Sequence, residues 1–258
     1  MSNISPAEKS EVLQKLSKKP IENAWAIQDL TLWPERTKFY YSDSFRGFSY
    51  LVVSGHPSQV KYPMVILNDD GGDVEKLFQY LPKGPFVIRE TRASIIQKIQ
   101  PMIPQAEIYH EHRMDLLKEN FKPPTQIKSR RLTEADAAAL ARFQGAPPQA
   151  TEGMKFWIRG AVIMAIFEGD MIVSMGTTIV RTTDVWDLAG IETLPEFRKM
   201  GYATDVVAAL SVEAFKSVSI VSLTVLKNNT PAIKTYSKLG FELKEDRVWI
   251  DNGTGSKP

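Results

Sequence analysis

The stretch PEFRKMGYATDVVAAL, residues 195–210, decides how this chain is interpreted. It follows a strand-like run at 187–194 and passes through a basic turn with one glycine into an apolar pattern of helical period. A helix N-terminus carries about half a positive charge and several N–H groups without an intrahelical partner. A strand, a basic glycine turn and a helix start therefore predict an anion-binding site.

The residues of the turn favour a diphosphate as the anion. Gly201 has no Cβ and would let a phosphate approach the backbone, and the small Ala203 would do the same one step further on. Arg198 and Lys199 add positive charge. An ordinary strand–turn–helix connection would also use a glycine here, so the motif needs support from its surroundings.

Composition limits the class of protein. The 258 residues suffice for one large domain or two modest ones with a sizeable core. A net charge of +2 gives no field that favours nucleic acid or a membrane surface, so neither partner is expected. The absence of cysteine excludes disulfides, thiolate metal sites and a cysteine nucleophile, and it fits a cytoplasmic protein. Apolar runs such as 161–167 are too short to cross a bilayer, and residues 1–19 lack the apolar segment of a signal peptide.

A domain boundary is predicted at FKPPTQIKSRRL, 121–132, where two adjacent prolines disfavour a helix. The chain then divides into residues 1–125 and 126–258. The first part has helical patterns, then strand-like runs alternating with helical patterns, which predicts a small α/β domain. The helical patterns lie at 5–18, 22–32, 72–81 and 92–100, and the strand-like runs at 47–55, 63–68, 84–90 and 106–112. None of its motifs indicates a chemistry.

The second part predicts the order strand, helix, three strands, helix, strand, helix, strand. Thr133 and Asp136 have the spacing of a capping box, and 168–170 is a tight hairpin turn. Asn229 or Thr230 is placed to cap the last helix, and Gly240 to end it. The predicted strands lie at 127–132, 160–168, 171–180, 184–194, 219–226 and 242–250.

Three motifs in this order resemble the GCN5-related N-acetyltransferase (GNAT) superfamily. IETLPEFRKMGYAT, 191–204, is similar to the acyl-CoA pyrophosphate loop R/Q-x-x-G-x-G/A. NTPAIKTYSKLGF, 229–241, is similar to the segment N-x-x-A-x-x-x-Y-x-x-x-G-F, and IKSRRLTEADAAAL, 127–140, to the opening strand and helix. The resemblance covers about 126–250. It implies an α/β fold with a mixed, largely antiparallel central sheet flanked by helices, which splays between its fourth and fifth strands.

The resemblance also implies a set of cofactor contacts. Thr193 and Leu194 would pair with the pantetheine arm of coenzyme A. Asn229 would hydrogen-bond the same arm, unless it serves only as the helix cap. The diphosphate would be held by the backbone of Arg198, Lys199, Met200, Gly201, Tyr202 and Ala203, with a hydroxyl from Thr204. Ala203 stands where a second glycine is frequent, and Lys199 where a second arginine would give bidentate contact.

Two residues are catalytic candidates by the same resemblance. Tyr236 would protonate the departing thiolate, or else it is an aromatic residue packed on the sheet. Glu192 would remove the proton of the acceptor amine, directly or through a water relay, or else it is a solvated carboxylate. Asp187 would point to the opposite face from Glu192 if the strand is regular.

The predicted function is an acetyl-CoA-dependent N-acetyltransferase, a transferase whose acceptor is an amine of a small molecule or peptide. A non-catalytic acyl-CoA-binding regulatory module is the alternative. A dinucleotide-binding domain is a further one, although G-x-G-x-x-G is absent. The N-terminal part is either a degenerate copy of the same architecture, closing the acceptor cleft, or a subunit interface, which would allow a homodimer.

Histidines offer no metal site. His110 and His112 would share a strand face at a spacing that a metal ion could use, but no third ligand accompanies them. A surface or structural role is expected for both, and for His56, and no metal is expected.

Overall fold

The structure is a computed structural model that describes residues 6–45, 47–55 and 62–255. The chain forms two compact units. Unit 1 comprises Met1–Arg113, Val225–Asn228 and Lys244–Pro258, and unit 2 comprises Met114–Thr224 and Asn229–Leu243. His56 lies outside the described residues.

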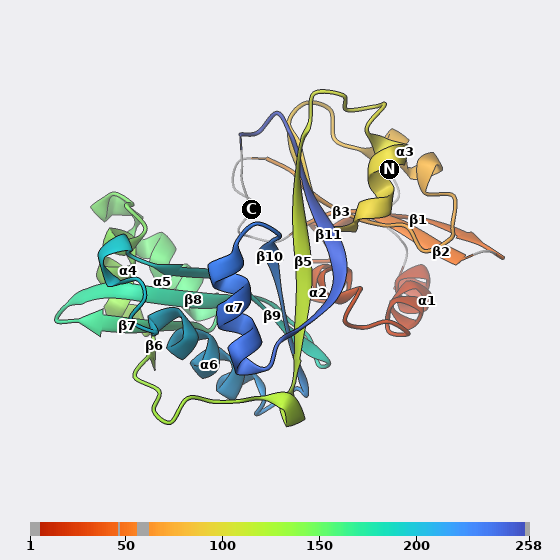
Figure 1. The fold of residues 1–258 in the computed structure, drawn as a ribbon. Coiled ribbons are helices and arrows are strands. Elements are labelled where there is room, and N and C mark those ends of the chain that lie inside the picture. Colours follow the sequence, from red (N-terminus) through yellow and green to blue (C-terminus); the bar gives the residue numbers. More distant parts are fainter. Residues whose placement is uncertain (1–5, 46, 56–61, 256–258) are drawn as a thin grey trace. The chain divides into compact units, whose positions relative to one another are not determined.

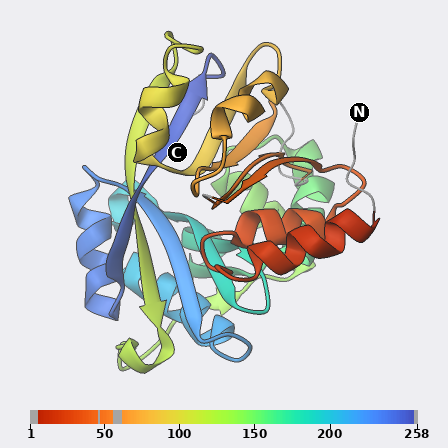
Figure 2. The same ribbon diagram turned by 90° about the vertical axis from the view of Figure 1, so that its right-hand side faces the viewer.

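Unit 1 is built from two helices followed by strands. Its strand order is β1-β2-β3-β4-β11-β5, and Figure 2 shows α1 and α2 (red) side by side. The pattern at 72–81 forms a 3₁₀ helix, and strand β1 was missed by the sequence interpretation. The elements are α1 (Pro6–Leu16), α2 (Ala24–Leu32), β1 (Lys38–Ser44), β2 (Gly47–Val53), β3 (Met64–Asn68), the 3₁₀ helices η1 (Val74–Tyr80) and η2 (Ala93–Ile95), β4 (Phe86–Arg92), α3 (Ile96–Ile99), and most of β5 (Glu107–Leu117) and β11 (Glu242–Asn252).

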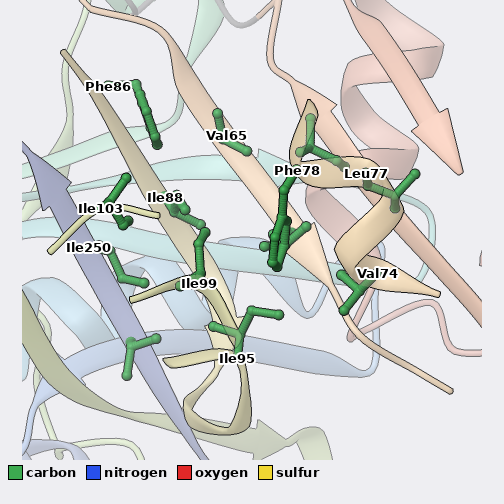
Figure 3. Close-up of a cluster of buried hydrophobic side chains, with 13 residues drawn as sticks. Val65, Val74, Leu77, Phe78, Phe86, Ile88, Ile95, Ile99, Ile103 and Ile250 are labelled. Atoms are coloured by element: carbon green, nitrogen blue, oxygen red, sulfur yellow. The ribbon is translucent and has the colours of Figure 1, made fainter. Parts of the chain in front are cut away.

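One hydrophobic core lies between the strands of unit 1 and its short helices. Figure 3 shows Val65, Ile88 and Ile250 from three strands pointing toward the same cluster as Phe78 of η1 and Ile99 of α3. All five are at least 96% buried. Burial of each of these side chains stabilises the fold by roughly 1.5–3 kcal/mol. The core therefore stabilises the short helices, which would not form from their intrinsic helix propensity alone.

Unit 2 has the predicted fold class: a mixed, largely antiparallel sheet with helices. Its strand order is β5-β10-β9-β8-β7-β6. The pairs β6–β7, β7–β8 and β8–β9 are antiparallel, and β9–β10 is parallel. The elements are β6 (Arg130–Arg131), α4 (Ala137–Phe143), α5 (Thr151–Gly160), β7 (Ile163–Glu168), β8 (Met171–Arg181), β9 (Val185–Thr193), α6 (Tyr202–Ala214), β10 (Ile220–Leu226) and α7 (Thr230–Leu239).

The two faces of this sheet carry different helices (Figure 1). Met175 of β8 packs in the cluster of α4 and α5. The next residue, Gly176, faces α6, and a Cβ there would lie 2.9 Å from the side chain of Val206 and 3.0 Å from that of Leu210. Glycine at this position therefore lets α6 approach the strand closely. Helix α5 was missed by the sequence interpretation, because Gly153 and the preceding prolines weaken the helical signal.

Two local predictions are confirmed. Thr133 and Asp136 form the capping box, with the Thr133 N–H donating to Asp136 Oδ2 at 2.8 Å. The hydrogen-bonded guanidinium of Arg130 is the largest cause that lowers the pKa of Asp136 to about 2. The hairpin turn at 168–170 joins β7 to β8, with Gly169 at φ 59°.

Unit 2 depends on residues that precede the predicted boundary at 121–132. The Lys118 N–H donates to Ser219 O at 3.0 Å, and the Lys122 N–H donates to Leu239 O at 3.0 Å. The buried Ser222 hydroxyl donates to Asp115 at 2.9 Å. The division into domains 1–125 and 126–258 stays a prediction.

Gly240 ends α7 as predicted, and its surroundings add a second constraint. Its φ of 101° is left-handed. A Cβ there would lie 2.1 Å from Asn120 O. Gly145, which follows α4, has φ 61° but nothing within 4 Å of its Cβ position. Within the described ranges, no helix is long and apolar enough to cross a membrane.

Alanine substitutions at Gly145 and Gly240 distinguish the cost of backbone strain from the cost of a steric clash. Gly145→Ala should lose about 1–2 kcal/mol of unfolding free energy, from the left-handed φ alone. Gly240→Ala should lose more, roughly 2–4 kcal/mol, because the methyl group also displaces the chain at Asn120. Chemical denaturation of both variants measures the difference, and equal losses would contradict the close approach at Gly240.

Candidate active site

The connection between β9 and α6 turns sharply. A 3₁₀ turn, Pro195–Phe197, follows β9. Lys199 and Gly201 then adopt left-handed conformations, with φ values of 65° and 83°. Gly201 is the N-cap residue of α6, and its Cβ position has nothing within 4 Å. Gly201 is thus required for its backbone conformation, and the space beside it is open.

Four backbone amides at the start of α6 have no acceptor among the described residues. The first helical hydrogen bond runs from Asp205 N–H to Gly201 O at 3.1 Å. The amides of Gly201, Tyr202, Ala203 and Thr204 precede it and carry the positive end of the helix dipole. Because the loop is exposed at Gly201, these donors are accessible to an anion.

The two basic residues of the loop are exposed. Neither Arg198 nor Lys199 has an ion-pair partner in the described part of the chain. Arg198 Nε donates to Thr193 O at 3.2 Å, which holds the side chain against the end of β9. Both charges are therefore available beside the four amides. We name this loop, residues 198–204, the α6 cradle.

Strands β9 and β10 diverge as predicted. Their parallel pairing covers only Val185–Leu188 of β9, while the strand continues to Thr193. Gly190, at φ 58°, lies where the register with β8 shifts. A β-bulge turns a strand away from its partner. The splay confirms that part of the predicted fold, and the strand edge beyond Leu188 ends beside the α6 cradle.

Thr193 and Leu194, at the end of β9, differ in which of their backbone groups are free to pair with a ligand along this edge. The Leu194 N–H donates to Val173 O at 2.9 Å, toward β8. Leu194 O accepts from the Phe197 N–H at 2.9 Å. The Thr193 hydroxyl is 2.8 Å from the Ser174 hydroxyl, whereas its carbonyl faces Arg198. A ligand arm that pairs along this edge would therefore meet the backbone of Thr193 and not that of Leu194.

Asp205 fixes the cradle and was missed by the sequence interpretation. This buried carboxylate accepts from the Lys128 N–H at 2.6 Å and from the Ser129 N–H at 2.8 Å. An acidic residue in the first turn of a helix was a visible signal. Its partners were not, because they lie more than 70 residues away along the chain.

Tyr236 lies on α7, which packs beside α6. It is 6% exposed, and its ring lies 5.9 Å from that of Phe241. Burial raises the pKa of its hydroxyl to about 12. Among the described residues this hydroxyl has no hydrogen-bond partner. The predicted packing role therefore explains the position of the ring, while the hydroxyl group still has its proton available to donate.

Asn229 is a helix cap, as one of its two predicted roles required. Its side-chain oxygen accepts from the Ala232 N–H at 3.2 Å. The carboxamide nitrogen is left as a donor on an exposed residue. The second predicted role, a hydrogen bond to a ligand, needs only that nitrogen, so the two roles are compatible.

Glu192 is exposed, and within the described ranges its carboxylate has no hydrogen-bond or ion-pair partner. Asp187 is buried in the same strand. Asp187 and Glu192 would lie on opposite faces of a regular strand, but register shifts interrupt β9 between them.

Two further polar side chains, one in each unit, make contacts within the protein. Tyr202 donates its hydroxyl to Glu168 at 2.6 Å, which raises the pKa of that hydroxyl. His112 Nδ1 lies 2.9 Å from Asp246 in unit 1, in keeping with the expected structural role. Among the residues that the structure describes, no group of acidic, histidine or cysteine side chains is arranged to hold a metal ion.

The sequence matches one family model. Residues 164–250, which include β9, the α6 cradle and α7, match the model of FR47-like proteins. No curated protein matches the chain.

Solved structures match over nearly the full length. A Drosophila protein has a TM-score of 0.73 at 14% identity, covering 98% of this chain and 98% of its own. A GCN5-related N-acetyltransferase-like protein from Streptococcus suis has a TM-score of 0.65 at 13% identity, over 96% and 99%. A tandem GNAT protein from the clavulanic acid biosynthesis pathway has 0.60 at 12%, over 99% and 98%. Together with the family model, these matches confirm the predicted resemblance: the chain has the fold of the GNAT superfamily.

The geometry predicts how the cradle responds to loss of its buried anchor. Asp205→Asn replaces one acceptor oxygen by an NH₂ group that faces a backbone N–H, so unfolding free energy should fall by roughly 1–3 kcal/mol. The exposed Asp170, whose side chain has no described partner, is the matched control, and Asp170→Asn should change little. Chemical denaturation measures both, and a stable Asp205→Asn variant would contradict the anchoring role.

Proposed function

We propose that the chain is an acyl-CoA-dependent N-acyltransferase that uses acetyl-CoA and transfers its acetyl group to an amine of a small molecule or peptide. One observation carries the proposal. Four unpaired amides and two cations without an ion-pair partner among the described residues meet at the start of α6, beside the strand edge where the pairing of β9 with β10 has ended. A diphosphate with an extended arm is complementary to both features.

The residues of the cradle fit coenzyme A in distinct roles. The amides of Gly201, Tyr202, Ala203 and Thr204 would hold the diphosphate, with Arg198 and Lys199 neutralising its charge. Met200 would contribute only backbone to the loop. Thr193 would pair with the pantetheine arm, and the Asn229 carboxamide nitrogen would donate to it. When bound, the coenzyme supplies the acetyl thioester and leaves as the thiolate.

Tyr236 is the candidate acid. Burial holds its phenol neutral, so a proton is present at Oη at every ordinary assay pH. A phenol with a pKa of about 12 releases its proton reluctantly. Its first contribution is therefore a hydrogen bond to the sulfur as negative charge forms there.

Glu192 is the candidate base. Acceptor amines with a pKa near 10 are mostly protonated at neutral pH and must lose a proton before they attack. An exposed carboxylate without a partner can take that proton directly or through water. If a water relay without Glu192 does this, Glu192→Gln will leave the rate unchanged.

A binding assay separates this function from its alternatives. We expect acetyl-CoA and coenzyme A to raise the melting temperature, and NAD to leave it unchanged. Acetyl-CoA with a panel of amines, followed by free-thiol release, then identifies the acceptor. Binding without thiol release on any amine would favour the non-catalytic module. The cytoplasmic location and the oligomeric state stay predictions.

Tyr236→Phe tests the acid directly. Turnover should fall by about 100- to 10,000-fold, the usual contribution of a positioned acid, with little change in coenzyme affinity. The wild-type rate should not fall between about pH 7 and 10 through loss of this proton, because the raised pKa keeps the phenol neutral there. Tyr109→Phe in unit 1 is the control. Unchanged turnover in Tyr236→Phe would remove this residue from the mechanism.

A further inference from the structure

Unit 1 repeats the order of elements of unit 2. Its two helices α1 and α2 precede three strands, then η1, β4, α3 and β5. In the second half of the chain, after the short strand β6, the helices α4 and α5 precede three strands, then α6, β10, α7 and β11, although most of β11 lies in unit 1. The two halves share no repeat that is visible in the sequence, so the correspondence rests on topology alone.

The direction of strand pairing repeats as well. β1–β2 and β2–β3 are antiparallel and β3–β4 is parallel, just as β7–β8 and β8–β9 are antiparallel and β9–β10 is parallel. The final strands are exchanged: β11 pairs with β4, and β5 neighbours β10. In both halves a loop and then a helix connect the two strands of the parallel pair. The loop that runs from the last residue of β3 to the start of η1, residues 68–73, thus holds the topological position of the α6 cradle.

This loop uses its amides for the protein's own contacts. The amides of Asp70 and Gly72 donate to the hydroxyl of Ser49, at 3.2 and 2.9 Å. The Asp73 amide donates to the hydroxyl of Ser42 at 3.2 Å. A Cβ on Gly72 would lie 2.6 Å from Ser42 O, so this glycine lets the loop pack closely against the backbone of β1. A cavity of about 440 Å³ lies along the loop, but the carboxylates of Asp69, Asp73 and Glu75 line it, which disfavours a diphosphate there.

The helix that follows offers few free donors: among its first three residues, only the Glu75 N–H has no acceptor in the described part of the chain. η1 is a 3₁₀ helix of seven residues, whereas α6 is an α-helix of thirteen. The Val74 N–H donates to Gly72 O at 3.0 Å, and the Lys76 N–H donates to Asp73 O at 3.2 Å. Most of the amides that correspond in position to the unpaired amides of the α6 cradle are thus hydrogen-bonded in unit 1.

The charge of the loop is reversed. Asp69, Asp70 and Asp73 replace the basic residues of the α6 cradle. Lys98, Lys19 and Lys76 pair with these carboxylates, at 2.5, 2.6 and 2.6 Å. A diphosphate here would meet carboxylates and would have to displace them from their lysines.

We propose that unit 1 is a second copy of the acyltransferase fold that has lost its coenzyme site, so that each chain binds one coenzyme, at the α6 cradle. The location of that single site rests on the proposed function. The loss in unit 1 rests on the pairing, packing and charge of the loop at 68–73.

Titration calorimetry of the full chain with coenzyme A tests the proposal. The wild type should bind one equivalent. Gly201→Asp should weaken binding at least 100-fold, because aspartate tolerates a left-handed φ, caps a helix and fills the four amides with its own carboxylate. Asp73→Asn and Glu75→Gln, which reduce the negative charge of the unit 1 loop and of the first turn of η1, should leave stoichiometry at one and affinity within about twofold.

The possible outcomes distinguish failure of the proposed loss of the site in unit 1 from failure of the proposed function. Two equivalents in the wild type, or one equivalent retained by a folded Gly201→Asp variant, would overturn the loss of the site in unit 1. No binding by the wild type would overturn the proposed function and, with it, the single-site stoichiometry. A melting curve of Gly201→Asp without ligand verifies that the variant is folded.

Discussion

The four amides at the start of α6 have no acceptor within the described protein, and the local structure of unit 2 keeps them available. Gly201 turns the chain into the helix without adding a side chain to the opening. Gly176 lets α6 lie close against β8, and the buried carboxylate of Asp205 ties the first turn of the helix to the backbone at Lys128 and Ser129. A helix N-terminus that is held in this way presents its dipole at a fixed position.

The divergence of β9 and β10 supplies the second half of the site. Hydrogen bonding between the two strands stops at Leu188, and the bulge at Gly190 carries the rest of β9 away. Backbone groups along that edge then have room for an extended ligand. The parallel pairing that brings α6 back over the sheet also places its first turn at the carboxyl end of β9, where open α/β sheets generally bind ligands.

Local features of this fold could be predicted from the sequence, because they depend on a few neighbouring residues. The capping box at Thr133, the helix end at Gly240 and the turn at Gly201 were all predicted on chemical grounds that the structure bears out. Features that depend on distant pairing were not. The partners of Asp205 and the exchange of β5 and β11 between the halves leave no local signature. The same holds for the paired amides of the loop at 68–73, whose serine partners lie on other strands.

Hydrogen–deuterium exchange tests most directly whether the four amides at the start of α6 bind the coenzyme. Unpaired amides exchange fast, and they become strongly protected from exchange when a ligand accepts hydrogen bonds from them. Short labelling times, with and without coenzyme A, would report the amides of residues 200–205 and of residues 69–76 in one experiment. Strong protection of 200–205, with 69–76 unchanged, is the result that the structure predicts. Unchanged exchange at 200–205 under saturating coenzyme A, or protection confined to 69–76, would contradict it.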